Sequence, residues 1–256
     1  MLAFVPDVIR PLLDALDPQV IVEIGSEYGK TTRHLVDHAR FRGGIVHAID
    51  PAPLFDAAAW QAELSPTLVV HQKTSLEALT SVPRFDAVLI DGDHNWYTVF
   101  HELSLIEKLA RDRGHALPLV LLHDVAWPYG RRDLYYDVES IPVAHRQPCA
   151  RGGISPTAAE LLPRGGFNAH LMHAVLEGGR HNGVLTAVED WVEASPAAVD
   201  LIIIPAVFGL AIAIPKELSA RVPALSRIAS AWAVPEVSRF IERLEMARIA
   251  MLTGAR

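Results

Sequence analysis

Short apolar runs alternate with helix-like segments through the first half of the chain, and this alternation constrains the fold more than any other feature. Each run has the length of a buried strand, and the intervening segments have the apolar spacing of helices. The runs are residues 20–24, 45–49, 68–71, 85–90 and 117–122, and the clearest intervening helices are 31–39, 56–64 and 97–111. This order predicts an α/β protein with a parallel, doubly wound sheet.

The alternation breaks after residue 122. Residues 125–182 are rich in Gly, Pro, Arg and Tyr and contain only short helical pieces, such as 168–176. An insertion of this length usually carries or covers a site, so we expect it to cover the substrate. Asn182 is then expected to cap a helix, and residues 201–206 and 210–214 to form a terminal antiparallel hairpin. Together, these patterns predict one domain, residues 1–256, with a Rossmann-like, mostly parallel seven-stranded sheet.

The C-terminal tail, residues 216–256, has a helical pattern throughout. Within residues 235–252, four apolar side chains fall on one side of the predicted helix: Val237, Phe240, Ile241 and Leu244. This pattern favours a terminal helix packed on the domain. The alternative is that the tail packs against a second subunit and forms a homo-oligomer.

Composition and charge narrow the class of protein. The chain is 50% hydrophobic and 21% charged, as expected of a folded protein, and its net charge of −7 argues against a nucleic-acid partner. Cys149 is the single cysteine, so neither an internal disulfide nor a cysteine-based zinc site can form. The first residues do not match a signal peptide, and the apolar stretch 201–214 is too short to span a membrane. We therefore expect a cytoplasmic protein with no membrane partner.

A glycine-containing loop, GSEYGKTT, directly follows the first expected strand. A dinucleotide fingerprint would need glycine where this loop has Glu27 and Lys30, and the glycine-rich loop that cradles nucleotide phosphates has a different spacing. The remaining pattern consists of Glu23, Gly25 and Gly29. It suits a ligand with positive charge and no phosphate, such as the sulfonium and ammonium groups of S-adenosylmethionine.

The second expected strand ends at Asp50, which follows Gly25 by 25 positions. An acid at this place can accept hydrogen bonds from both hydroxyls of a ribose. The structural alternative is a strand-end Asp before Pro51 in an ordinary turn.

The segments VEIGSEYGKTT, HAIDPAP, TSLEAL, FDAVLIDGDHNWY and LLHDVAWPYG resemble class I S-adenosylmethionine-dependent methyltransferases, over roughly residues 18–215. The resemblance implies that Glu23, Gly25 and Gly29 line the methionine portion of the cofactor, with Ser26 in the same loop. It also implies that Asp50 holds the ribose.

Two further cofactor contacts follow from the same resemblance. Ser75 matches an adenine contact, although it could equally cap the helix that follows. Asp91 is expected beside the cofactor, at the end of the fourth strand.

A second group of chemically active residues follows the fourth and fifth strands. Asp91 and His94 lie in the sequence DGDH, and His123 and Asp124 end the next strand. Two carboxylates that meet at one sheet edge are costly unless a positive group lies between them. Oxygen ligands favour Mg²⁺ or another hard divalent cation.

The DGDH spacing, with an acid after the next strand, resembles metal-dependent macrolide-sugar O-methyltransferases. The resemblance implies that Asp91 binds the metal and that His94 is the general base. That family has an acidic pair where this chain has His123 and Asp124, so the resemblance implies a metal set of Asp91, Asp124 and His123, in which His123 departs from the family's pattern.

The expected reaction is methylation of a hydroxyl on a small natural product, with a sugar as the leading acceptor. His94, with an ordinary pKa near 6.5, would take the hydroxyl proton. Tyr129 and Arg131, in the insertion, are candidate substrate contacts. Two alternatives remain: a cephalosporin hydroxylase-like, metal-dependent oxygenase on the same fold, and a non-catalytic protein that binds S-adenosylmethionine.

Overall fold

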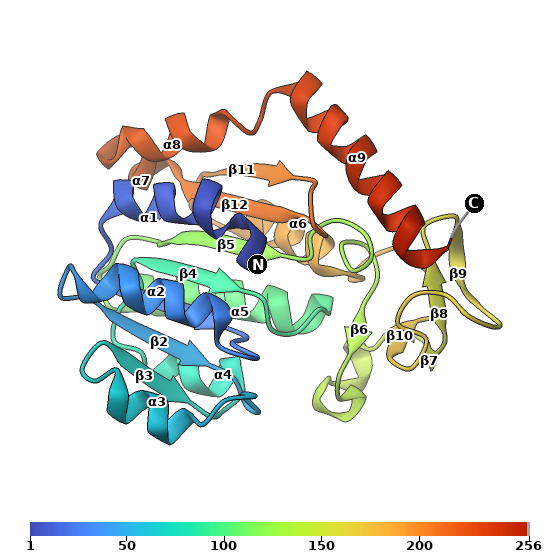
Figure 1. Cartoon of the computed structure of the whole chain (residues 1–256), viewed down its shortest axis with the longest axis horizontal. Coiled ribbons are helices and arrows are strands. Elements are labelled where there is room, and N and C mark those ends of the chain that lie inside the picture. The colour runs from blue at the N-terminus through green and yellow to red at the C-terminus, as the bar shows by residue number, and fades with distance from the viewer. Residues whose placement is uncertain (255–256) are drawn as a thin grey trace.

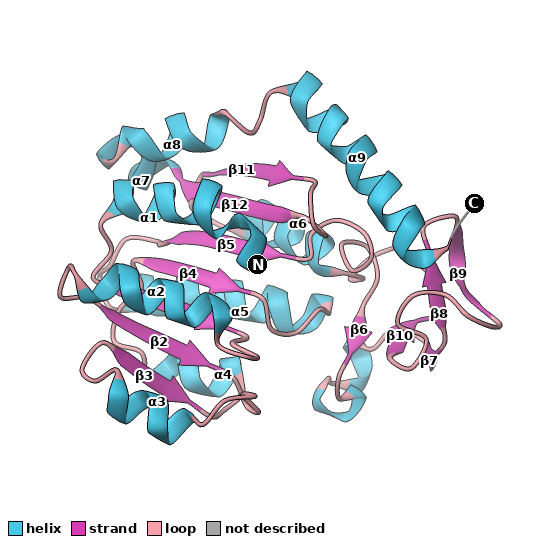
Figure 2. Cartoon of the chain, viewed as in Figure 1, coloured by secondary structure: helices cyan, strands magenta, loops and turns pink. Residues whose placement is uncertain are grey.

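The computed structural model describes residues 1–254 and consists of one large sheet beside a smaller lobe of short strands (Figures 1 and 2). The strands of the large sheet are β1 Val20–Ile24, β2 Ile45–Ile49, β3 Leu68–His71, β4 Ala87–Ile90, β5 Leu119–His123, β11 Val199–Ile204 and β12 Leu210–Pro215. Their order is β11-β12-β5-β4-β1-β2-β3. The strands β1 to β5 pair in parallel, and β12 is antiparallel to both neighbours. This confirms the expected seven-stranded sheet and its terminal hairpin.

Helices cover both faces of the sheet (Figure 1). The helices are α1 Arg10–Leu16, α2 Lys30–Arg40, α3 Ala57–Glu63, α4 Ser75–Ala78, α5 Trp96–Asp112, α6 Val184–Ala194, α7 Lys216–Arg221, α8 Pro223–Ser230 and α9 Pro235–Thr253. Single turns of 3₁₀ or π helix occupy Leu2–Phe4, Val5–Ile9, Leu79–Ser81, Val138–Ser140 and Val143–His145. No helix of the described chain is both long and apolar enough to cross a lipid bilayer.

Two apolar cores form because successive strand residues face opposite sides of the sheet. On β1, Val22 packs into the core that contains α5 and α6, whereas Ile21 packs into the core that contains α1, α2 and α8. These cores hold the strands in register. The loops at the carboxyl ends of the strands are therefore anchored on a rigid sheet.

The insertion differs from the sequence prediction. It contains a three-stranded sheet, formed by β6 Leu134–Tyr135, β10 Met172–Ala174 and β7 Cys149–Arg151. It also contains a two-stranded sheet, formed by β8 Gly153–Ser155 and β9 Ala158–Leu162. The helical piece expected at 168–176 is wrong, because this backbone pairs with two distant strands instead of with itself.

The start of α6 also differs from its prediction. Gly183, not Asn182, is the residue that precedes the helix. The Asn182 side chain accepts a hydrogen bond from the Asp133 backbone and donates to the carbonyls of Leu176 and Gly178. Asn182 therefore ties the insertion together instead of capping the helix.

The carboxyl ends of β1, β2, β4 and β5 meet at one edge of the sheet. From β1 the chain continues to β2 and β3 on one side and then crosses to β4 and β5 on the other side. Open α/β sheets bind ligands where the strand order reverses in this way. Because β12 is antiparallel to β5, the turn that joins β11 to β12 reaches the same edge, where Leu210 pairs with His123.

Candidate functional site

The loop after β1 lies directly against the loop after β4, at Gly25. A Cβ atom at Gly25 would overlap the carbonyl oxygen of Asp91, and its φ of +84° favours glycine. Gly29 is similarly enclosed, because a Cβ there would overlap the ring of Trp60. The two glycines thus permit close packing of this loop, and their role toward a cofactor stays a prediction.

Asp50 organises the glycine loop from the end of β2. Its Oδ2 atom accepts hydrogen bonds from the backbone N–H groups of Ser26 at 2.9 Å and Glu27 at 2.8 Å, and its Oδ1 accepts from that of Ala52 at 2.9 Å. A carboxylate offers about four acceptor positions, so one remains free on Oδ1. The predicted ribose contact would use that position or displace a loop bond.

Glu23 is buried near the carboxyl end of β1. Its Oε2 atom accepts a hydrogen bond from the Thr32 hydroxyl on α2 at 2.5 Å. Burial raises the pKa of Glu23 to about 8, against the opposing influence of Thr32. A positive ligand group beside Glu23 would favour its charged form.

Ser75 is the first residue of α4, and Thr74 precedes the helix in extended conformation. The interpretation of Ser75 as the cap of this helix is therefore wrong. Ser75 is buried beside Glu102 of α5, where its side chain lowers the pKa of that carboxyl. Its predicted contact with adenine is untested by this arrangement.

Asp91, His123 and Asp124 converge in one cluster at the carboxyl edge. One potential ligand atom from each residue lies within 4.8 Å of the other two. Nδ1 of His123 lies 3.0 Å from Oδ1 of Asp91 and 2.9 Å from Oδ2 of Asp124. The α-amino group of Met1 also reaches Asp91, at 2.9 Å from its Oδ2. These four groups form what we call the acidic centre.

The backbone fixes which nitrogen of His123 faces the acids. Its Nε2 lies 2.9 Å from the carbonyl oxygen of Val207, in the turn between β11 and β12. Because a carbonyl only accepts hydrogen bonds, Nε2 carries a proton. Nδ1 is therefore the nitrogen that faces Asp91 and Asp124. It offers a lone pair when His123 is neutral and donates a hydrogen bond when His123 is protonated.

His94 lies on the other side of Asp124. Its Nε2 is 2.9 Å from Oδ2 of Asp124 and 3.9 Å from Oδ1 of Asp91. Its ring stacks on Tyr129 at a centroid distance of 5.3 Å, and its Nδ1 lies 3.2 Å from the hydroxyl of Tyr136. The structure thus brings the predicted base to the predicted metal ligands.

The carboxylates of this cluster are balanced by the positively charged α-amino group of Met1 and by protons on the two histidines. Burial alone would lower the pKa of His123, but the neighbouring carboxylates of Asp124 and Asp91 raise it to about 9. Burial likewise opposes the charge of His94, and Asp124 nevertheless holds the pKa of His94 well above its usual value. The histidines in turn hold the pKa values of Asp91 and Asp124 well below the usual range, against the effect of burial.

The potential ligands of the acidic centre, two carboxylates and the imidazole nitrogen Nδ1 of His123, suit a divalent cation: the oxygens suit Mg²⁺ or Mn²⁺, and the nitrogen suits a softer transition metal. Magnesium ligands lie 2.0–2.1 Å from the ion, so neighbouring ligands of an octahedron are about 2.9 Å apart. The observed spacings of His123 Nδ1 from the oxygens of Asp91 and Asp124 are 3.0 and 2.9 Å. A cation would replace the proton on Nδ1 and neutralise the same carboxylates. If His123 bound such a cation, its hydrogen bond to the Val207 carbonyl would be the outer contact that orients the ring.

The structure places the two predicted substrate residues differently. Tyr129 is a buried residue of the insertion that stacks on His94, and its hydroxyl accepts a hydrogen bond from Asn168 at 2.6 Å. The guanidinium of Arg131 pairs with Glu189 on α6 through both terminal nitrogens, and with Thr186 at 3.0 Å. Arg131 is therefore already bound within the protein, and the structure lends no support to its substrate role.

Two residues near the centre were missed by sequence reasoning. Tyr136 is 61% exposed and reaches His94, and the only sequence signal for it was the aromatic-rich insertion after Asp124. Val207 contacts His123 through its backbone carbonyl, for which no side-chain signal exists.

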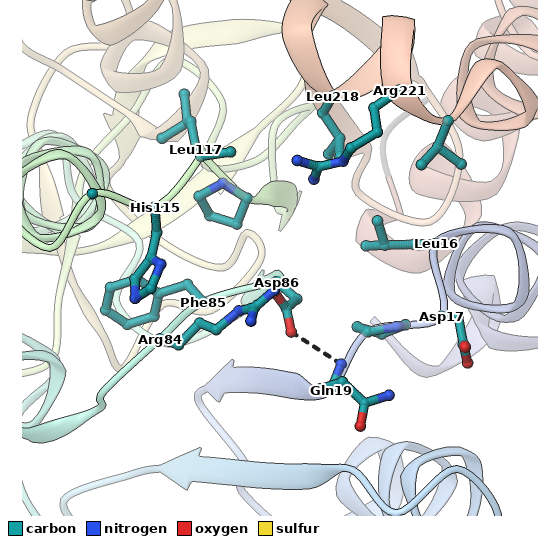
Figure 3. Close-up of a pocket in the computed structure, with 15 residues that line it drawn as sticks. Leu16, Asp17, Gln19, Arg84, Phe85, Asp86, His115, Leu117, Leu218 and Arg221 are labelled. Atoms are coloured by element: carbon teal, nitrogen blue, oxygen red, sulfur yellow. Dashed lines mark hydrogen bonds and ion pairs between the residues drawn. The ribbon is translucent and has the colours of Figure 1, made fainter.

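A cavity of about 390 Å³ lies at the opposite edge of the sheet, near the amino ends of the strands. Figure 3 shows its lining, where Leu16, Phe85 and Leu218 are apolar and Arg84 and Arg221 are charged. None of the predicted site residues lines this cavity, so it is separate from the acidic centre.

A family model described as a methyltransferase domain, Methyltransf_24, matches residues 22–125. This range contains the glycine loop and every member of the acidic centre except Met1. A comparison with curated proteins found no match.

Remote likenesses to solved structures were also found. An SAH-bound methyltransferase of Podospora anserina is 15% identical, with coverage of 81% of this chain and 76% of that one and a TM-score of 0.46. A putative caffeoyl-CoA O-methyltransferase of Staphylococcus aureus is 15% identical, with coverage of 81% and 80% and a TM-score of 0.47. A 1,6-didemethyltoxoflavin-N1-methyltransferase of Burkholderia thailandensis is 14% identical, with coverage of 82% and 79% and a TM-score of 0.44. At this distance the likenesses carry no argument about chemistry.

The match to a methyltransferase domain covers β2 to β5 and all but the first two residues of β1, which together form the parallel part of the sheet. Residues 126–182 of the insertion and the C-terminal helical tail lie outside the matched range.

Proposed function

We propose that the protein methylates a hydroxyl group of a small natural product, with a sugar as the acceptor, and that a divalent cation assists. The observation that carries this proposal is the convergence of Asp91, His123 and Asp124 beside His94, at the sheet edge that also holds the glycine loop. Two acids and two histidines lie together there, and they could hold a cation and supply the base that deprotonation of a weakly acidic hydroxyl requires.

The metal-binding residues in this proposal are Asp91, Asp124 and Nδ1 of His123. A bound divalent cation would lower the pKa of the acceptor hydroxyl. It would also offset the negative charge that now raises the pKa values of the two histidines, so His94 would be freer to act as a base.

His94 takes the acceptor proton at Nδ1. In the structure this atom faces the hydroxyl of Tyr136, whereas the opposite nitrogen, Nε2, faces buried Asp124. The acceptor hydroxyl would take the place of the Tyr136 hydroxyl. Asp124 then stabilises the resulting imidazolium, and the stacked ring of Tyr129 holds the plane of His94.

The cofactor residues in this proposal are Glu23, Gly25, Ser26, Gly29, Asp50 and Ser75, with Asp91 at the boundary between cofactor and metal. S-adenosylmethionine supplies the methyl group on a sulfonium. Glu23 supplies a buried carboxyl near that positive charge, and Asp50 holds the loop around the cofactor.

The aromatic residues of the insertion favour a sugar-like acceptor. Tyr136 presents an exposed aromatic ring beside the base, and Trp127 lies in the same insertion against Phe167. Aromatic faces with a few fixed polar groups suit the faces and hydroxyls of a sugar.

The test is transfer of a labelled methyl group from S-adenosylmethionine to a panel of glycosides, with and without a chelator. We expect transfer that a chelator removes and Mg²⁺ restores. Equal activity in chelator and in Asp91→Asn would remove the metal from the proposal. Asp37→Asn is the matched control, because Asp37 is an exposed acid on α2.

Metal analysis of the purified protein separates this proposal from the oxygenase alternative. Tightly held iron with oxygen-dependent turnover would favour hydroxylation over methyl transfer. Binding of S-adenosylmethionine without turnover over the whole panel would favour a non-catalytic role.

We also propose that α9 pairs with α9 of a second copy. The apolar residues Val237, Phe240, Leu244 and Met251 are all at least 43% exposed. Their spacing of three, four and seven positions places them on one helix face, with the heptad spacing of a helix-pairing seam. Phe240→Glu with Leu244→Glu should convert an oligomer to a monomer in light scattering, and a wild-type monomer would refute the pairing.

A further inference from the structure

The turn between β11 and β12 is held in a backbone conformation that its residues disfavour. Val207 has a φ of +47° and Phe208 a φ of +68°, and Gly209 follows with +90°. The left-handed region is unusual for any side chain and especially for a β-branched one such as Val207. Strain of this kind persists only where the surroundings hold the turn in place, and it is typical of functional positions.

The strained turn holds His123. The Val207 carbonyl accepts the hydrogen bond from Nε2 of His123 at 2.9 Å, and the Phe208 carbonyl accepts one from the Ala126 backbone at 2.8 Å. Both bonds join the turn to the segment that begins with His123 and Asp124. If the turn relaxed, the Val207 carbonyl would move and the His123 ring would lose its fixed orientation.

Glu245 of α9 holds the turn from the other side. It is only 6% exposed, and its Oε1 accepts a hydrogen bond from the Phe208 backbone at 2.9 Å. Arg248 donates to both carboxylate oxygens, at 2.7 and 2.8 Å, and its guanidinium lies 4.5 Å from the centre of the Phe208 ring. These donors keep the pKa of Glu245 below its usual value although burial acts in the opposite direction.

The burial pattern of α9 shows that this contact is unusual for a terminal helix. Glu245 and Ile249 are its buried residues, so one of the two side chains that it buries is an acid. A helix that served packing alone would bury its apolar residues, yet Phe240 and Leu244 are 53% and 55% exposed. The buried residues of α9 thus include an acid that contacts the strained turn.

We propose that Glu245 is a positioning residue of the acidic centre: it anchors the Val207–Gly209 turn, and the turn fixes the ring of His123 so that Nδ1 faces Asp91 and Asp124. The proposal rests on the proposed function only where the cation is concerned. The orientation of His123 can be measured without any cation. Glu245 touches none of the groups that would react, and its effect passes through one backbone carbonyl.

The test compares Glu245→Ala and Glu245→Gln with Glu242→Gln, an exposed acid one turn earlier on the same helix. The first readout is NMR of the His123 side chain in the metal-free protein, with its signal assigned by its absence in His123→Asn. We expect exchange of the Nε2 proton with water to accelerate at least about tenfold in Glu245→Ala and to stay unchanged in Glu242→Gln. An unchanged exchange rate in a folded Glu245→Ala protein would overturn the proposal.

The second readout is the affinity for Mn²⁺ alone, measured by calorimetry. Loss of an outer contact to a metal-binding histidine typically costs about 10- to 100-fold in affinity, so we expect this loss in Glu245→Ala with unchanged binding of S-adenosylmethionine. If the wild type binds no Mn²⁺, the cation part of the proposed function fails and the proton exchange alone decides the role of Glu245. If Glu245→Ala does not fold, Glu245→Gln decides: it keeps the side-chain length but loses the charge that Arg248 binds, and its exchange should exceed that of Glu242→Gln.

Discussion

Nε2 of His94 lies 2.9 Å from Oδ2 of Asp124, and both side chains are buried. The two residues come from the ends of neighbouring strands, β4 and β5, which pair in parallel. The acid holds the pKa of His94 well above its usual value, despite burial. This pair joins the predicted base to the predicted metal site.

Asp124→Asn should reduce methyl transfer by at least about 100-fold, because it removes both a proposed cation ligand and the charge that stabilises the His94 imidazolium. Calorimetry should show unchanged binding of S-adenosylmethionine, because Asp124 is not a proposed cofactor residue. The rate is measured with labelled cofactor, and Asp37→Asn is the control. Retention of wild-type activity would exclude Asp124 from the reaction.

Substitutions of His94 and of its acceptor-side partner, Tyr136, should differ sharply in their effect on methyl transfer. His94→Ala should reduce methyl transfer by about 100-fold or more, because it removes the base. Tyr136→Phe should retain activity within about threefold, because the acceptor takes the place of the Tyr136 hydroxyl on Nδ1. Equal losses in the two variants would instead make Tyr136 part of the proton path.

Gly25→Ala should weaken binding of S-adenosylmethionine at least about tenfold and lower the melting temperature. Its Cβ would overlap the Asp91 carbonyl and separate the two loops at the proposed site. Gly43→Ala is the matched control, because Gly43 has a φ of +69° and open space around its Cβ position. Calorimetry and thermal unfolding measure the two effects. Equal behaviour of both variants would show that backbone strain alone is responsible.

Glu102→Gln should change the pH dependence of stability. Burial raises the pKa of fully buried Glu102 to about 8 from an ordinary value of 4.5, and Asp93 adds to the shift. Between these pH values the folded state keeps a proton that the unfolded chain releases. The free energy of unfolding therefore falls as pH rises through this window, by up to about 1.4 kcal/mol per pH unit.

The Gln side chain of the Glu102→Gln variant does not titrate in this pH range, so the variant lacks this pH-dependent loss of stability. Relative to the wild type, its free energy of unfolding should increase from pH 5 to pH 8, as measured by urea unfolding at about these two values. Glu242→Gln, at an exposed position, should show no such change. A constant difference between Glu102→Gln and wild type at both pH values would contradict the pKa shift.

The sheet and the place of the site follow from local sequence patterns. Apolar runs that alternate with helices predict a parallel sheet, and parallel strands bring their carboxyl ends to one edge. For this reason the positions of Gly25, Asp50, Asp91 and Asp124 at a common edge could be predicted without coordinates. Their chemical types in that order then indicated the ligand class.

The sequence by itself thus determined the seven-stranded sheet, the glycine loop and the meeting of Asp91 with Asp124. Only the tertiary structure decided how the insertion folds, which nitrogen of His123 faces the acids, and that Glu245 supports the turn behind it. The reason is the range of the contacts: the carbonyl that orients His123 lies 84 positions away, and the acid that holds the turn lies a further 37 positions from Phe208. Backbone carbonyls carry no side-chain signal, so such contacts exist only once the cores have placed the strands.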